Sequence, residues 1–167
     1  MAHAADYEHD IFISYAHDDN HAQGRDPGWV DQFQAWLESW LTRRRGMKRL
    51  SIWRDTRRMG GNTLFDDAIR KAVQGSALFF ALVSRNYLDS AYCRDELNGF
   101  HQHHGATPAG LKVGDHGRIF TLLLNNIPHD RYQQELPPLK GTAGFPFHDA
   151  ATDQELGDFT SIRDEPL

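Results

Sequence analysis

The sequence has 167 residues, of which 40% are hydrophobic and 11% aromatic, which is enough for one globular domain with its own core. Its formal net charge of −5 excludes the broad basic surface that binds nucleic acid without sequence preference. A single cysteine excludes an internal disulfide framework and favours a reducing compartment. No apolar run is long enough to cross a bilayer, and the N-terminal MAHAADYEHD lacks the apolar core of a signal peptide, so we expect a cytoplasmic protein without membrane contact.

The first predicted elements are a strand over Asp10–Tyr15 and a helix that begins at Asp26-Pro27. A long polar loop, Ala16–Gly28, joins them. Aspartate is favoured as a helix cap, and proline is favoured in the first helical position. The helix extends to about Arg45 and carries an apolar stripe, which we interpret as core packing; its members are Trp29, Phe33, Trp36, Leu37, Trp40 and Leu41.

A short second strand is predicted over Leu50–Trp53, and Asp55 lies just after it. A cationic loop follows; it contains Arg57, Arg58, Gly60 and Gly61. Asn62 or Thr63 is expected to cap the next helix, which ends before Gly75.

The stretch 77–100 organises the rest of the chain. Ala77–Val83 is an unbroken apolar run, which is typical of a strand buried on both faces. A polar loop from Ser84 to Asp89 is expected next, and then a helix with Ser90 as its N-cap. Positions 93, 97 and 100 form the core face of this helix, so Tyr92 and Glu96 share a neighbouring face. An aromatic ring and a carboxylate therefore meet at the carboxyl end of a buried strand, where open α/β sheets bind ligands.

Further along, Gly105–Gly117 is expected to be a glycine-rich connection and Arg118–Leu124 a fourth strand. No regular structure is predicted from there until a short edge strand over Phe145–Phe147. Because strands alternate with helices, we expect an α/β fold with a flavodoxin-like parallel sheet of four to five strands and helices on both faces. We assign residues 1–150 to one domain, and 151–167 to a tail or to the start of a linker or helix that leads to a partner domain.

Several chemistries lack their motifs. The sequence contains no G-x-x-x-x-G-K-[ST] phosphate loop, no G-x-G-x-x-G fingerprint and no G-x-S-x-G nucleophile elbow. His101, His103 and His104 do not share one helical face, so we expect no metal site there. Cys93 lies on the predicted core face, where a thiol is unreactive.

Ser90, Cys93 and Glu96, within S-R-N-Y-L-D-S-x-Y-C-x-x-E-L, resemble a segment of Toll/interleukin-1 receptor (TIR) domains. Three more stretches are similar in order and spacing: Asp10–Tyr15, Ile52-x-x-Asp55 with Gly60-Gly61 behind it, and Ile69–Val73 leading to Ser76. The similarity is closest to bacterial members and to the branch that cleaves NAD, which implies NAD as a substrate and no bound cofactor.

The resemblance assigns roles to residues of the site. Glu96 stands where those enzymes carry their catalytic carboxylate, and Tyr92 stands where they often carry tryptophan. Relatives often have a basic residue after the first strand, and here that region is Ser14, Tyr15, Ala16 and His17. Ala16 departs from that pattern, which leaves His17 or Arg85 to contact the pyrophosphate of NAD. Ser84, next to Arg85, is also expected to contact the substrate. Asp55 either contacts ribose or anchors the cationic loop that contains Arg57 and Gly60. Because the resemblance implies that this loop contacts a neighbouring subunit, we call it the assembly loop.

One carboxylate suffices for this reaction, because nicotinamide is cationic on the ribose and neutral when it leaves, so no general acid is needed. The products are nicotinamide and ADP-ribose or a cyclised or transferred form. The resemblance also implies self-association of TIR domains into open filaments through the assembly loop, a fused or separate sensor domain, and a setting in bacterial anti-phage immunity. Two alternatives stay open: a non-catalytic TIR interaction module, and a nucleoside deoxyribosyltransferase-like enzyme.

Overall fold

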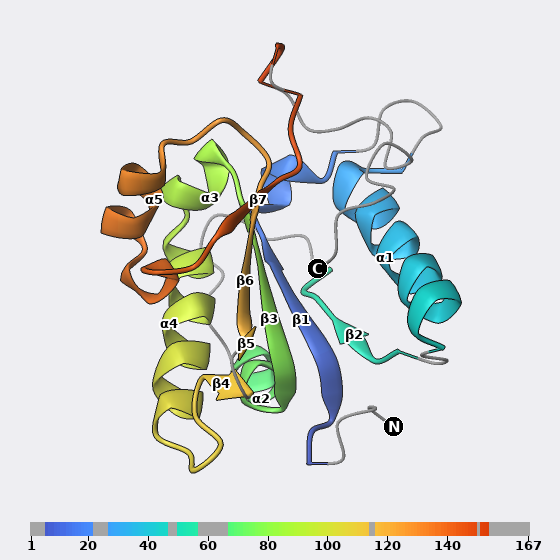
Figure 1. Ribbon diagram of the computed structural model, residues 1–167, viewed down its shortest axis with the longest axis vertical. Helices are drawn as coiled ribbons and strands as arrows, with labels where there is room; N and C mark the ends of the chain where they lie inside the picture. The colour runs from blue at the N-terminus through green and yellow to red at the C-terminus, as the bar shows by residue number, and fades with distance from the viewer. Residues whose placement is uncertain are drawn as a thin grey trace.

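A five-stranded parallel sheet forms the centre of the computed structural model, which describes residues 6–21, 27–46, 50–56, 67–113, 116–149 and 151–153 (Figure 1). The strands lie in the order β2-β1-β3-β6-β7. Their bounds are β1 His9–Tyr15, β2 Ile52–Trp53, β3 Ser76–Val83, β6 Ile119–Leu123 and β7 Gly144–Pro146. In chain order of the sheet strands this is 2-1-3-4-5, the flavodoxin-like order, so the predicted sheet is confirmed. A separate antiparallel pair joins β4, Lys112–Val113, to β5, His116–Gly117.

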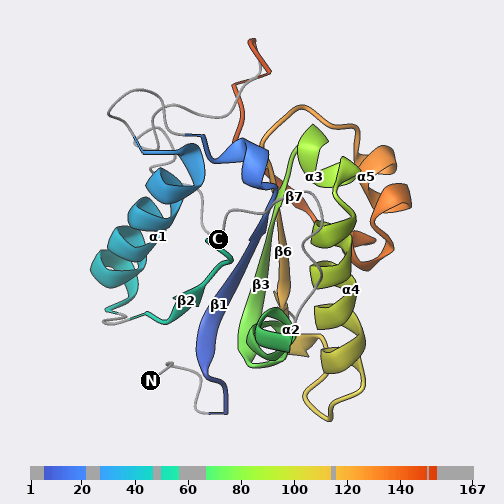
Figure 2. The same ribbon diagram turned by 180° about the vertical axis from the view of Figure 1, so that it is seen from behind.

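Helices cover both faces of the sheet, as predicted. Figures 1 and 2 show α1, Trp29–Arg45, on one face and the other described helices on the opposite face. Those helices are α2 Asp67–Gln74, α3 Arg85–Asp89, α4 Ala91–Gly105 and α5 His129–Glu135. Two short 3-10 turns, η1 His17–Asp19 and η2 Pro137–Leu139, complete the elements of the described residues.

The core lies in two layers, one on each side of the sheet, because successive strand residues point to opposite faces. Phe12 of β1 packs toward α2 and α4 and stacks on Phe79 of the neighbouring strand, with ring centroids 5.4 Å apart. Ile11 and Ile13 point to the other face and pack with Phe33 of α1. Residues on both faces of β1 and β3 are buried, which explains the continuous apolar run over 77–83.

The predicted start of the first helix at Asp26-Pro27 is wrong, because α1 begins at Trp29 with Gly28 as its N-cap. The cap comes from outside the helix: the side-chain oxygen of Asn20 accepts a hydrogen bond from the Asp31 backbone N–H at 3.1 Å. Glycine is required at position 28, because a Cβ there would lie 2.2 Å from Oδ1 of Asn20. The apolar stripe packs as predicted, with Phe33 and Leu37 buried.

Three segments predicted as irregular contain regular structure. The polar loop after β3 is helix α3, since the Ser84 hydroxyl caps it by accepting from the Tyr87 N–H at 3.0 Å. The glycine-rich connection contains the β4–β5 pair. The segment before the predicted edge strand contains α5 and η2. Helix α5 is held by Tyr132, which is buried in the core. Turn η2 begins at Pro137, where the backbone N–H that proline lacks is not needed for a hydrogen bond.

The edge strand itself is confirmed as β7. The assembly loop, the predicted caps Asn62 and Thr63, and residues 154–167 lie outside the described residues.

Candidate functional site

Glu96 lies in the second turn of α4, at the carboxyl end of the sheet. The helix begins as predicted, because the Ser90 hydroxyl accepts from the Cys93 N–H at 3.2 Å. Cys93 and Leu97 are buried on the core face, so Glu96, one residue before Leu97, is turned toward the ends of β1 and β2. Its side chain is only 2% exposed.

Burial raises the pKa of Glu96 well above its usual range, and the nearby carboxylate of Asp55 raises this pKa further. A hydrogen bond with the Ser14 hydroxyl lowers it in part. Ser14 is itself buried at the end of β1, and its Oγ also hydrogen-bonds Oη of Tyr87 at 2.9 Å. The site therefore holds a carboxyl group whose charged form is disfavoured.

Asp55 lies just after β2 and faces the same region from the other side. It is 4% exposed, and its Oδ2 accepts a hydrogen bond from the Tyr92 hydroxyl at 2.6 Å. Tyr92 is one helical turn before Glu96, so it shares the face that the sequence predicted. The structure thus brings Ser14, Asp55, Tyr92 and Glu96 together.

Two further rings border this site. Tyr15 stacks on His17, with centroids 5.0 Å apart and planes 5° apart, and His17 meets Tyr92 edge-on at 6.5 Å. The Tyr15 hydroxyl donates to the backbone oxygen of Asp55 at 2.6 Å. Asp55 is therefore held at its backbone by β1 and at its carboxylate by α4. Ala16 is buried before η1 and packs in the core layer that contains Phe12.

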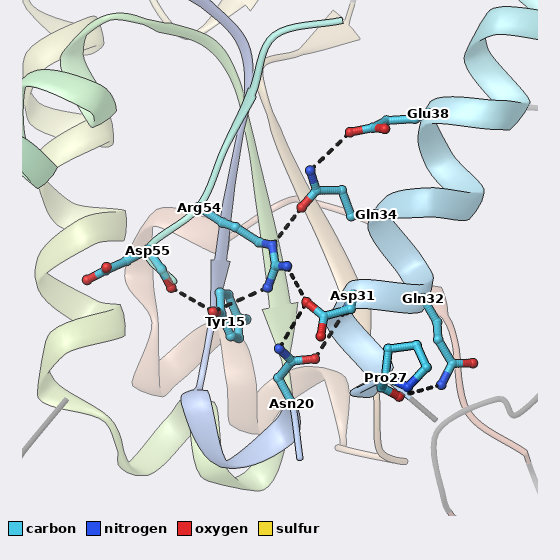
Figure 3. A network of polar contacts seen from close by, with 9 residues as sticks. All are labelled: Tyr15, Asn20, Pro27, Asp31, Gln32, Gln34, Glu38, Arg54 and Asp55. Atoms are coloured by element: carbon cyan, nitrogen blue, oxygen red, sulfur yellow. Dashed lines mark hydrogen bonds and ion pairs between the residues drawn. The ribbon is translucent and has the colours of Figure 1, made fainter. Parts of the chain in front are cut away.

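A polar network behind Tyr15 joins the site to α1 (Figure 3). Arg54 donates to Asp31 and, at 2.6 Å, to Oε1 of Gln34, and its guanidinium lies 5.6 Å from the Tyr15 ring centroid. Figure 3 shows the Asp55 backbone oxygen facing Tyr15 while its carboxylate points away from that ring. Sequence reasoning missed Arg54 and Asp31, because only the fold brings together residues 23 positions apart.

Ser84 and Arg85, both expected to contact substrate, have other partners. The Ser84 hydroxyl caps α3 and donates to the buried carboxylate of Asp19, which also accepts from the Asn86 side chain at 2.8 Å. Arg85 pairs with Asp153, so its guanidinium is directed to the segment after β7. Asp19 and Tyr87 were missed; the available signal for Asp19 was a carboxylate in the polar loop after the first strand.

Burial raises the pKa of the Cys93 thiol well above its usual range, and Glu96 adds to this, so Cys93 is a core residue as predicted. Within the described ranges, no group of three or more His, Cys, Asp or Glu side chains has the arrangement to hold a metal ion. The described helices include none that is both long and apolar enough to span a bilayer.

Comparison with known proteins gives two findings. The model of the family described as "TIR domain" matches residues 11–158. Among solved structures, the fold is similar to the TIR domains in the structure of the activated Roq1 resistosome directly recognizing the pathogen effector XopQ, with a TM-score of 0.58 and 14% identity over 93% of this chain and 95% of that one. A search of functionally curated proteins gave no match.

Proposed function

This chain belongs to the TIR-domain family, and from that premise we propose that it is an NAD⁺ glycohydrolase in which Glu96 is the catalytic carboxylate. The family contains both NAD-cleaving enzymes and interaction modules, so the site has to support the choice between them.

The reaction breaks the bond between the ribose anomeric carbon and the nicotinamide ring nitrogen, and the electron pair of that bond neutralises the ring. Water adds to the anomeric carbon and loses a proton, which gives ADP-ribose. Positive charge develops on the sugar in the transition state, and an ionised Glu96 beside it stabilises that charge. Asp55 supplies a second acceptor for ribose hydroxyl groups. The ring of Tyr92 offers an aromatic face to the cationic nicotinamide.

The observation that carries this proposal is the environment of Glu96. The carboxyl group is buried next to a second carboxylate, and no cation forms an ion pair with it within the described part of the chain. Such a group destabilises the fold whenever it ionises, so its presence is best explained by a ligand that gains from its charge. NAD⁺ has its positive charge on the nicotinamide ring, which would favour the ionised form of Glu96 when it binds.

A second candidate, a non-catalytic interaction module, is favoured by the low exposure of the same carboxylate, since Glu96 at 2% exposure does not meet a substrate in this conformation. We therefore include activation by self-association in the proposal. The structural neighbour is described as an activated resistosome. In the sequence, the assembly loop begins two residues after Asp55. Stacking of subunits head to tail would give open filaments. Bacterial anti-phage defence, by NAD depletion or by a nucleotide signal, is the setting that we propose.

The proposal is tested by incubating concentrated protein with NAD⁺ and measuring nicotinamide by chromatography. We expect nicotinamide release that depends on protein concentration. If none is released at any concentration, with crowding agents included, the interaction-module alternative replaces this proposal. Cleavage of deoxynucleosides in place of NAD⁺ would instead support the deoxyribosyltransferase alternative.

A further inference from the structure

We propose that Tyr87 is a positioning residue for the candidate catalytic carboxylate: its hydroxyl donates to Ser14 and so directs the single Ser14 hydroxyl proton to Glu96. The three side chains come from three elements, because Ser14 lies near the end of β1, Tyr87 in α3 and Glu96 in α4. The role in catalysis rests on the proposed function, whereas the direction of the hydrogen bonds does not.

The three groups form a polar chain inside the core. Ser14 and Tyr87 are 0% exposed and Glu96 is 2% exposed, so bulk water is not their partner. Oγ of Ser14 and Oη of Tyr87 lie 2.9 Å apart, and the Ser14 hydroxyl also hydrogen-bonds Glu96. Buried polar groups are hydrogen-bonded in nearly all native structures, so each proton of this chain needs an acceptor.

The number of available protons determines the direction of both bonds. A phenol has one proton, and within the part of the chain that the structure describes, Ser14 is the only partner of the Tyr87 hydroxyl. Burial raises the pKa of Tyr87 well above its usual range, so the hydroxyl keeps that proton. Tyr87 is therefore the donor, because its proton would otherwise be buried without an acceptor. The one proton of Ser14 is then available to Glu96, which only accepts when it is ionised.

Cys93 is the competing acceptor for the Ser14 proton. Burial, with a further contribution from Glu96, raises the pKa of the Cys93 thiol well above its usual range, so the thiol stays protonated beside Ser14. A thiol sulfur is a weak acceptor and a carboxylate a strong one, so the proton goes to Glu96. Without Tyr87, Ser14 could donate to the sulfur and accept from a neutral Glu96. Tyr87 therefore favours the ionised carboxylate that the reaction needs.

The surroundings of Glu96 make this donor important. Burial raises the pKa of Glu96 most, and Asp55 and Asp95 raise it further, whereas the hydrogen bond with Ser14 lowers it. The titratable side chains that border the site are Asp55 after β2, Tyr87 of α3, Cys93, Tyr92 and Asp95 of α4, and His17 and Asp19 of η1.

The first test measures the ionisation of Glu96 without any ligand. Infrared spectra show a carbonyl stretch that only a protonated carboxyl group has, and subtraction of the Glu96→Gln spectrum isolates the band of Glu96. Tyr87→Phe keeps the ring and removes the hydroxyl, and we expect it to move the titration midpoint upward by at least about 0.5 pH unit. The control Tyr132→Phe, at another buried tyrosine, should leave the midpoint unchanged. An unchanged or lower midpoint in Tyr87→Phe overturns the proposal, as does an equal shift in the control.

A second variant shows whether Tyr87 acts through Ser14. Ser14→Ala removes the donor itself and should raise the midpoint by about 1 pH unit or more. Adding Tyr87→Phe to Ser14→Ala should move the midpoint no further, because the Tyr87 hydroxyl then has no proton to direct. A further shift in the double variant overturns the route through Ser14. If Tyr87→Phe does not fold, Ser14→Ala decides, since a midpoint equal to that of wild type overturns the proposal.

The third test follows nicotinamide release by concentrated protein as a function of pH. The acid limb of kcat/KM reports groups of the free enzyme, and in Tyr87→Phe it should move upward with the infrared midpoint. At pH values above both limbs, kcat/KM should return to that of wild type. An equal loss at every pH is the result of a merely structural role and overturns the proposal. An infrared shift together with no nicotinamide release by either protein keeps the direction of the hydrogen bonds and instead refutes NAD as the substrate.

Discussion

Both ends of the sheet bury ionisable side chains, but the partners of these side chains differ. At the carboxyl end, burial raises the pKa of Glu96, and the nearby carboxylate of Asp55 raises it further. At the amino end, Arg118 is 2% exposed and donates to the backbone oxygens of Ala77 and Gly110, each at 2.8 Å. Its guanidinium also lies 4.9 Å from the centroid of the Tyr7 ring.

The two buried groups differ in whether their neighbours stabilise the ionised form. Two carbonyl oxygens and a ring face contact the buried guanidinium, although its Nη2 has no hydrogen-bond partner within the described residues, so Arg118 ties β3 to the turn before β4 and stabilises the fold. A second carboxylate does not compensate a buried carboxyl group, so Glu96 destabilises the fold once it is ionised. We infer that the amino end was shaped by stability and the carboxyl end by a ligand.

The two ends also respond to pH in opposite directions. Burial lowers the pKa of His104, beside Arg118, to about 4, so its contribution to stability is complete above pH 6.5 and is lost as the pH falls toward 4. The pKa of Glu96 is raised, so the contribution of Glu96 to folding stability is complete below pH 4.5 and is lost as the pH rises through the folded-state pKa of this group.

The largest expected effect is on stability at the amino end. Arg118→Met keeps much of the side-chain volume but leaves the Ala77 and Gly110 carbonyls without their donors, and we expect it to lower the free energy of unfolding by about 3 kcal/mol or more. Urea denaturation measures this. Arg131→Met removes an exposed arginine from α5 and should cost less than about 0.5 kcal/mol. Similar losses in both variants would remove the contrast between the two ends.

His104→Gln tests the pH dependence of the amino end. The wild type should lose up to about 3 kcal/mol of unfolding free energy between pH 6.5 and pH 4 because His104 must take up a proton, and the variant should lack this part of the loss. Denaturation at several pH values in that window measures it. Parallel curves for the two proteins would show that His104 does not titrate as described.

Substitutions of Tyr92 sharpen the account of the carboxyl end. Tyr92→Ala removes the aromatic face and should lower kcat/KM for NAD⁺ by about tenfold, whereas Tyr92→Trp should preserve or raise it. Steady-state kinetics compare the three proteins. Equal values for all three would show that the ring does not face the substrate.

Self-association is expected to have a smaller effect, of severalfold, on activity per molecule. Specific activity should rise with protein concentration, and charge reversal of Arg57 and Arg58 should lower it without unfolding the domain. Nicotinamide release across a dilution series, with circular dichroism as the control for folding, measures both. Activity per molecule that stays constant from dilute to concentrated samples contradicts activation by assembly.

Most of the sheet and the placement of Glu96 could be predicted from the sequence, because they depend on local patterns. The run over 77–83 and the Ser90 cap are readable without tertiary information. Helix α5 was missed because Tyr132 is the one buried residue of that short helix. A single buried position leaves no repeating pattern of apolar residues in the sequence. Two tertiary features, the Tyr92–Asp55 bond and the burial of Arg118, have no local signature.

The central claim, that a destabilising carboxylate is retained at the carboxyl end for catalysis, is tested most directly by Glu96→Gln at pH 8, with activity and stability measured on the same samples. The charge is removed while size and helix propensity are kept, so nicotinamide release should fall at least about 100-fold. The free energy of unfolding should rise relative to wild type, because glutamine removes the loss that Glu96 causes above pH 4.5. Normal turnover of NAD⁺ by the variant, or a variant less stable than wild type at this pH, would contradict the account.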